Sequence, residues 1–196
     1  HAFATALNPG DWSAVWIRVR RPIVGWAPYL RTKFDLRAAP VRTARLYVSG
    51  LGCGEYYING QKISEDMIDP PMTNYNREVL YRIYDVSRFL PAGGGRCALA
   101  ALLGEGWYAQ SRVWAVGGFR YGDPCLCAQL EIVYEDGQTQ TVATGTEGWF
   151  SKCSPIVLNN LYGGETYDAR LETPDFADPD GEEDGWSPVE ADPVPK

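Results

Sequence analysis

The chain has 196 residues, of which 45% are hydrophobic and 22% charged, as expected for one globular domain of ordinary size. Its formal net charge of −7, without any Lys/Arg cluster, argues against nucleic acid as a partner, because a polyanion would be repelled. No apolar run approaches the roughly 20 residues of a membrane span, so a membrane is not an expected partner either.

Short extended segments, separated by Gly, Pro, Asn and Asp, indicate β-strands in the first half of the chain. Residues 1–11 show neither a strand pattern nor a signal peptide, so we expect a leader segment there. Asn59-Gly60 tolerates positive φ at both positions and predicts a tight hairpin turn. A single helical turn is predicted over 86–90, with Ser87 as its cap. The strands expected in this half are 15–20, 29–36, 44–50, 55–63, 78–86 and 97–104.

The second half continues the same pattern. Two alternating runs in 126–144 flank Asp136-Gly137 and predict a hairpin, and short strands follow at 148–152 and 163–170. With no convincing amphipathic helix, residues 12–172 predict an all-β fold, an antiparallel β-sandwich of the jelly-roll type. Residues 173–196 are acidic and proline-rich and are expected to be a linker that leads to the start of a following domain.

The cysteines give no sign of a metal site but bear on the redox compartment of the protein. Five cysteines, an odd number without CxxC pairs or an internal histidine, do not form a zinc pattern. Buried free thiols in a reducing environment are the better interpretation, although one disulfide remains open. A cytoplasmic location is therefore expected more than a secreted one.

Four segments, in order along the chain, carry a family resemblance. They are ARLYVSGLGCGEYYINGQKI (44–63), DPPMTNYNREVLYRIYDVSRFL (69–90), GEGWYAQSR (104–112) and LYGGETYDARLE (161–172). Together they resemble the N-terminal domain of bacterial α-L-rhamnosidases of glycoside hydrolase family 78, whose fold is similar to galactose-binding jelly rolls.

The resemblance implies an accessory role. The family's active site lies in a separate (α/α)6 barrel, which this chain does not contain and which would be its partner within a longer polypeptide. In some relatives a related domain binds L-rhamnose with calcium, so L-rhamnose or a rhamnosylated glycan is the expected ligand, and calcium is a candidate cofactor. Two interpretations stay open: a non-catalytic carbohydrate-associated domain, or a purely structural scaffold that packs on the barrel without binding sugar.

Two long loops, 66–76 and 105–114, hold the candidate sugar contacts, since aromatic faces and planar polar groups suit sugar rings and hydroxyls. In a jelly roll both loops converge at one end. The alternative is that Tyr75 and Trp107 pack the core beneath the loops while Asp69 begins a turn. Calcium, which needs six to eight oxygens, would take Asp69 and Asn74. The candidate carbohydrate-binding residues are Asp69, Asn74, Tyr75, Asn76, Glu105, Trp107, Tyr108 and Trp114.

The sequence carries no recognisable catalytic machinery. Glycoside hydrolysis uses two carboxylates that flank the scissile bond, and Glu165 and Asp168 are the most motif-like pair. We expect them to be structural, with Arg170 available to pair with a carboxylate. A Ser-His-Asp or Cys-His system is excluded because His1 is the only histidine.

Overall fold

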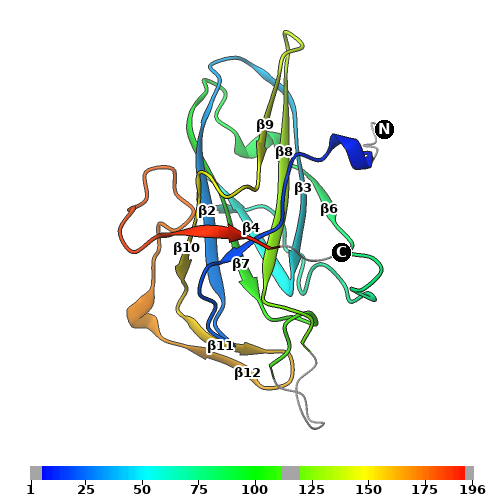
Figure 1. The fold of residues 1–196 in the computed structure, drawn as a ribbon. Coiled ribbons are helices and arrows are strands. Elements are labelled where there is room, and N and C mark those ends of the chain that lie inside the picture. The colour runs from blue at the N-terminus through cyan, green and yellow to red at the C-terminus, as the bar shows by residue number, and fades with distance from the viewer. Residues whose placement is uncertain (1–5, 112–119, 193–196) are drawn as a thin grey trace.

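A computed structural model describes residues 6–111 and 120–192, and these residues form a curled antiparallel β-sandwich (Figure 1). Three short 3-10 turns interrupt the strands, η1 (Pro9–Asp11), η2 (Ser87–Phe89) and η3 (Ala169–Leu171). No described helix is long and apolar enough to span a membrane. The strands are β1 (Ile17–Val19), β2 (Pro28–Leu36), β3 (Val41–Leu51), β4 (Cys53–Ile58), β5 (Gln61–Lys62), β6 (Arg82–Asp85), β7 (Gly95–Gly104), β8 (Cys125–Tyr134), β9 (Thr139–Ala143), β10 (Trp149–Cys153), β11 (Ile156–Asn160), β12 (Gly164–Tyr167) and β13 (Ser187–Ala191).

The strands form two layers that one strand joins. One layer has the order β5-β4-β7-β2-β10 and the other β1-β8-β3-β6. Strand β9 lies outside this order and pairs with β8. Strand β13 pairs with β10 on one side and with β1 on the other. Every pairing among the described strands is antiparallel, and β11 and β12 form a separate hairpin at one end (Figure 1). The predicted all-β antiparallel sandwich is confirmed.

Alternation along the strands builds the core. Leu46 and Val48 of β3 face Leu99 and Leu103 of β7 across the interior, and all four side chains are essentially inaccessible. Trp149 of β10 closes the same cluster. Because successive residues of a strand point to opposite faces, the residues between these positions form the outer faces of the two layers.

Local sequence signals placed the turns correctly. Asn59 and Gly60 have φ values of 50° and 77° and join β4 to β5. Gly137, with φ of 81°, turns β8 into β9. The helical turn expected over 86–90 is η2, but Ser87 is its first residue and Val86, not Ser87, occupies the cap position.

The segment expected to be a linker is part of the domain. Its final strand, β13, pairs over Ile17–Val19 of β1 and with Phe150 and Ser151 of β10, and its Val189 is 2% exposed in the core. The prediction of a sandwich that ends at residue 172 was therefore wrong for the described residues up to 192. Short apolar anchors in an acidic sequence give no strand pattern that could reveal this.

The cysteines are all free. Cys97, Cys125 and Cys127 are buried, whereas Cys53 is half-buried and Cys153 is exposed. Burial raises the pKa of the Cys127 thiol to about 11, so this group is protonated at neutral pH.

Candidate functional site

The two candidate loops meet at one end of the sandwich, as expected. The rings of Tyr75 and Tyr108 lie 5.2 Å apart at an interplanar angle of 86°, and both rings also contact Tyr121. With Leu51 they form a second, smaller apolar cluster. Tyr75 is 3% exposed and Tyr108 2%, so the two rings brace the loops from beneath. Burial also raises the pKa of Tyr75 to about 12.

Asp69 is buried and already paired. Its Oδ1 accepts a hydrogen bond from Arg82 Nε at 2.8 Å, and its Oδ2 accepts one from the Tyr84 hydroxyl at 3.3 Å. Its backbone carbonyl accepts from the Gly54 amide. Asp69 thus anchors the loop to β4 and β6 and offers no open oxygen to a ligand.

Asn74 and Asn76 lie exposed on a turn. The Asn74 carbonyl accepts hydrogen bonds from the amides of Arg77 and Glu78, and its side-chain Oδ1 accepts one from the Asn76 amide. This turn shortens the strand expected over 78–86 to β6. No group of three or more His, Cys, Asp or Glu gathers within the described ranges. Calcium binding by Asp69 and Asn74 stays a prediction.

Glu105 braces the second loop. Its Oε2 accepts hydrogen bonds from the amide and hydroxyl of Ser111 and from Asn160 Nδ2, and its side chain is buried. Trp107 is half-buried, with its ring 6.1 Å from the exposed ring of Tyr162 in an edge-on arrangement. Trp114 lies outside the described residues.

A groove that the sequence did not predict adjoins the first loop. It encloses about 380 Å³ over the outer face of β3 and β8, with Ser49 and Cys127 in its lining. Four aromatic side chains and two exposed charged residues contribute to its wall. These lining residues are Trp12, Trp16, Tyr75, Tyr81, Arg77 and Glu78.

Long-range hydrogen bonds hold the groove open. The amides of Ser13 and Ala14 donate to Gln129 Oε1 at 2.7 and 3.1 Å, and Gln129 Nε2 donates to the Asp11 carbonyl. These bonds fix the N-terminal segment across the sheet. The ring of Trp12 then stands 5.3 Å from that of Tyr81 at an angle of 87°.

Walls of this kind suit a small polar ring. Flat aromatic faces pack against the C–H face of a sugar, while guanidinium and carboxylate groups pair with hydroxyls. The volume lies at the lower end of the range for small-molecule sites, which run from about 300 Å³ upwards. No sequence signal marked the groove, because the residues that line it come from four separate parts of the chain, from Trp12 to Cys127.

The carboxylates considered for catalysis have structural surroundings. Asp168 binds Arg170 through two parallel contacts of 2.8 and 2.5 Å, and these hydrogen bonds lower the pKa of Asp168 to about 2. Glu165 is exposed on β12. A general acid in glycoside hydrolysis needs a raised pKa, so Asp168 does not fit that role.

These features define an antiparallel β-sandwich domain of the jelly-roll type. Comparison with known proteins identifies its family: the α-L-rhamnosidase N-terminal domain matches residues 39–196, and the chain belongs to that family. An α-L-rhamnosidase of Streptomyces avermitilis is 37% identical over 95% of the chain, and one of Formosa agariphila is 35% identical over 82%. The chain spans only 17% of the length of each.

Solved structures agree. The α-L-rhamnosidase of Aspergillus terreus superposes on 96% of the chain with a TM-score of 0.88 at 31% identity, over 22% of its own length. The Streptomyces avermitilis enzyme, solved in complex with L-rhamnose, superposes on 88% with a TM-score of 0.81 at 38% identity, over 16% of its own length. A lectin of Pleurotus ostreatus, at 15% identity and a TM-score of 0.57 over 91% of this chain and 41% of its own, shares the fold alone.

Proposed function

We propose that the chain is a non-catalytic domain of an α-L-rhamnosidase and that it contacts carbohydrate through the groove beside Tyr75. The observation that carries the proposal is the groove itself: four aromatic side chains and two charged ones around about 380 Å³. The parent enzyme would hydrolyse terminal α-L-rhamnosides in a separate (α/α)6 domain. L-Rhamnose suits the groove because its methyl group and C–H face are apolar while its hydroxyls are polar.

A thermal-shift titration with L-rhamnose tests the proposal. A ligand that binds only the folded chain raises its melting temperature in a concentration-dependent way. Tyr81→Ala removes one wall of the groove and should weaken binding by about threefold to tenfold, equivalent to roughly 0.5–1.5 kcal/mol for an aromatic contact. Trp107→Ala, at the opposite loop, should retain both fold and binding. If Trp107→Ala abolishes binding and Tyr81→Ala does not, the sugar site lies at the 105–111 loop instead.

Calcium enters the same titration as a separate arm. Since Asp69 is paired with Arg82 and Tyr84, we expect rhamnose binding to be the same in calcium and in a chelator. Binding that disappears with the chelator would establish calcium as a cofactor and contradict this expectation.

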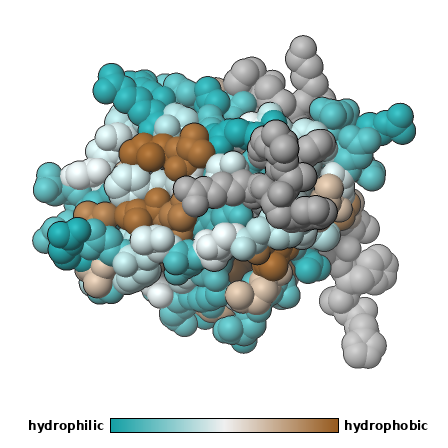
Figure 2. All heavy atoms as spheres, turned by 90° about the horizontal axis from the view of Figure 1, so that it is seen from below, coloured by the Kyte–Doolittle hydropathy of each residue, from teal (hydrophilic) through white to brown (hydrophobic). Residues whose placement is uncertain are grey.

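A scaffold role is the second candidate, and one observation favours it. Ile23 and Val24, in the loop before β2, are 54% and 60% exposed. Apolar patches are visible on the face that Figure 2 shows, at the end of the molecule that carries β11 and β12. Exposed apolar surface of this kind is typical of contacts with another domain. If this surface packs on another domain, the isolated chain should self-associate through it, and Ile23→Ser/Val24→Ser should reduce that self-association without changing rhamnose binding.

A further inference from the structure

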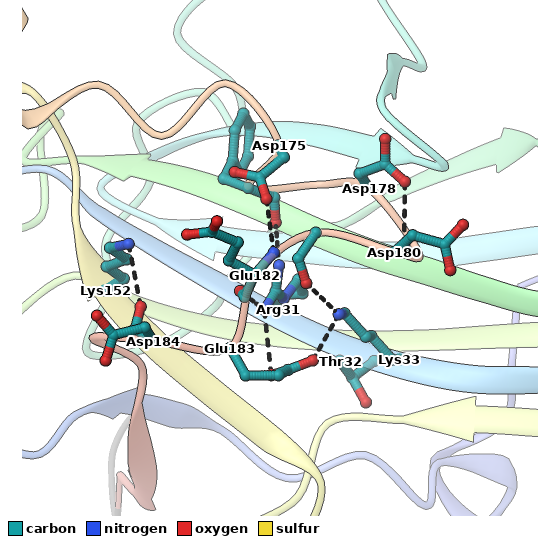
Figure 3. A network of polar contacts seen from close by, with 12 residues as sticks. Arg31, Thr32, Lys33, Lys152, Asp175, Asp178, Asp180, Glu182, Glu183 and Asp184 are labelled. Atoms are coloured by element: carbon teal, nitrogen blue, oxygen red, sulfur yellow. Dashed lines mark hydrogen bonds and ion pairs between the residues drawn. The ribbon is translucent and has the colours of Figure 1, made fainter.

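A pocket with excess positive charge lies on the outer face of the other layer. It encloses about 290 Å³ and is lined by Arg31 and Lys33 of β2, Arg96 of β7, Phe150 of β10, and Glu183. Arg31 and Lys33 are two positions apart, so both point to the same face. Figure 3 shows them directed at the segment that carries Glu182 and Glu183.

Two cations share one carboxylate, and a third cation lies nearby. Glu183 Oε2 lies 3.3 Å from Arg31 Nη2, and Glu183 Oε1 lies 2.5 Å from Lys33 Nζ. Arg96 has no carboxylate within ion-pair distance in the described part of the chain, yet it is close enough to act on both Arg31 and Glu183 electrostatically. The lining residues therefore carry three positive charges and one negative charge, while Asp175 also acts on Arg31 and Asp35 lies opposite Arg96 in the strand register.

Arg31 is fixed without Glu183. Its guanidinium donates to the carbonyls of Phe176 and Glu182 at 3.3 and 2.8 Å and lies 4.0 Å from the centre of the Trp186 ring. Glu183, in contrast, is 60% exposed and lies on a surface loop. Only the carboxylate end of this contact is exposed, since Arg31 and Lys33 are 2% and 11% exposed, so a ligand that displaces Glu183 has to supply a carboxylate to both cations.

We infer that this pocket binds the carboxylate of an acidic sugar, with Glu183 as the internal group that the ligand displaces. Glu183 itself demonstrates that a carboxylate fits between Arg31 and Lys33. Arg96 supplies a third, unengaged guanidinium, a group suited to planar carboxylates. The exposed edge of Phe150, which pairs with Arg31 across the strands, offers an apolar face to the attached ring. The claim that a sugar carries this carboxylate rests on the proposed function. The claim that the pocket binds an anion does not.

Calorimetric titration with methyl β-D-glucuronide at low salt tests the inference, with methyl β-D-glucoside as the neutral match. The glucuronide should bind and the glucoside should not. Arg96→Gln should weaken glucuronide binding roughly twofold to fivefold, as expected for an exposed charge contact. Glu183→Gln should strengthen it by a similar factor because the internal competitor is removed. Asp184→Asn, with the same change of charge one position along, should have little effect.

Three results would overturn the inference: no glucuronide binding, equal strengthening by Glu183→Gln and Asp184→Asn, or equally tight binding of a sugar sulfate. Equal strengthening by the two variants would show that net charge alone attracts the ligand. Equally tight binding of a sugar sulfate would show that the site recognises negative charge rather than a carboxylate. A chain that binds glucuronide but not L-rhamnose would refute the proposed rhamnose contact and leave this pocket standing. The reverse result would refute the pocket alone.

Discussion

Replacement of Phe176 tests whether the acidic C-terminal segment is part of the folded unit. The Phe176 ring stacks on Tyr29 with centroids 3.9 Å apart and meets Tyr57 edge-on at 4.9 Å. A Phe→Ala change in a closed core costs about 3–5 kcal/mol, and each aromatic pair contributes about 0.5–1.5 kcal/mol. Because Phe176 is only half-buried, we expect Phe176→Ala to lower the free energy of unfolding by about 2–3 kcal/mol.

Urea unfolding followed by circular dichroism measures this loss. The midpoint should fall while the slope stays the same, since the surface exposed on unfolding barely changes. Phe150→Ala is the matched control: its ring is 37% exposed, so its loss should stay below about 1 kcal/mol. A loss below about 0.5 kcal/mol for Phe176→Ala would mean that the segment detaches freely, as a linker would.

Two further predictions concern the pair of Asp69 with Arg82 and the reactivity of the cysteines. Asp69→Asn should lower the free energy of unfolding by about 1–2 kcal/mol. This loss is smaller than for a fully buried ion pair because Arg82 is half-exposed. If the losses of Asp69→Asn and Arg82→Gln are purely additive in the double variant, the pair contributes nothing. At pH 8, iodoacetamide should modify Cys153 first and leave Cys127 intact, because burial keeps its pKa near 11; intact-mass spectra that show Cys127 alkylated at a comparable rate would contradict the burial.

The parts of the fold that sequence could predict are those set by neighbours in the chain. Asn59-Gly60 and Asp136-Gly137 specify their turns through backbone conformation alone. The alternating apolar positions of β3 and β8 specify which face is buried. Both kinds of signal lie within a few residues, so a pattern reveals them.

The candidate site depends on distant contacts and was less predictable. The groove exists because Gln129 holds Ser13, 116 positions away, across the sheet. Arg31 and Glu182, which join the acidic segment to β2, are 151 positions apart. The sequence correctly predicted that the loops of Tyr75 and Tyr108 converge. It did not predict that Asp69 forms an ion pair with Arg82, because the sequence around an acidic loop residue is the same whether the carboxylate is paired or free.

The most direct test of the account is a nuclear magnetic resonance titration of L-rhamnose into the chain, followed at the indole signals of its tryptophans. The account predicts saturable shifts for Trp12 and Trp16, which line the groove, and none for Trp149, which is buried in the core. If no indole signal moves at millimolar L-rhamnose, or if only Trp107 responds, the groove is not the site where this domain contacts carbohydrate.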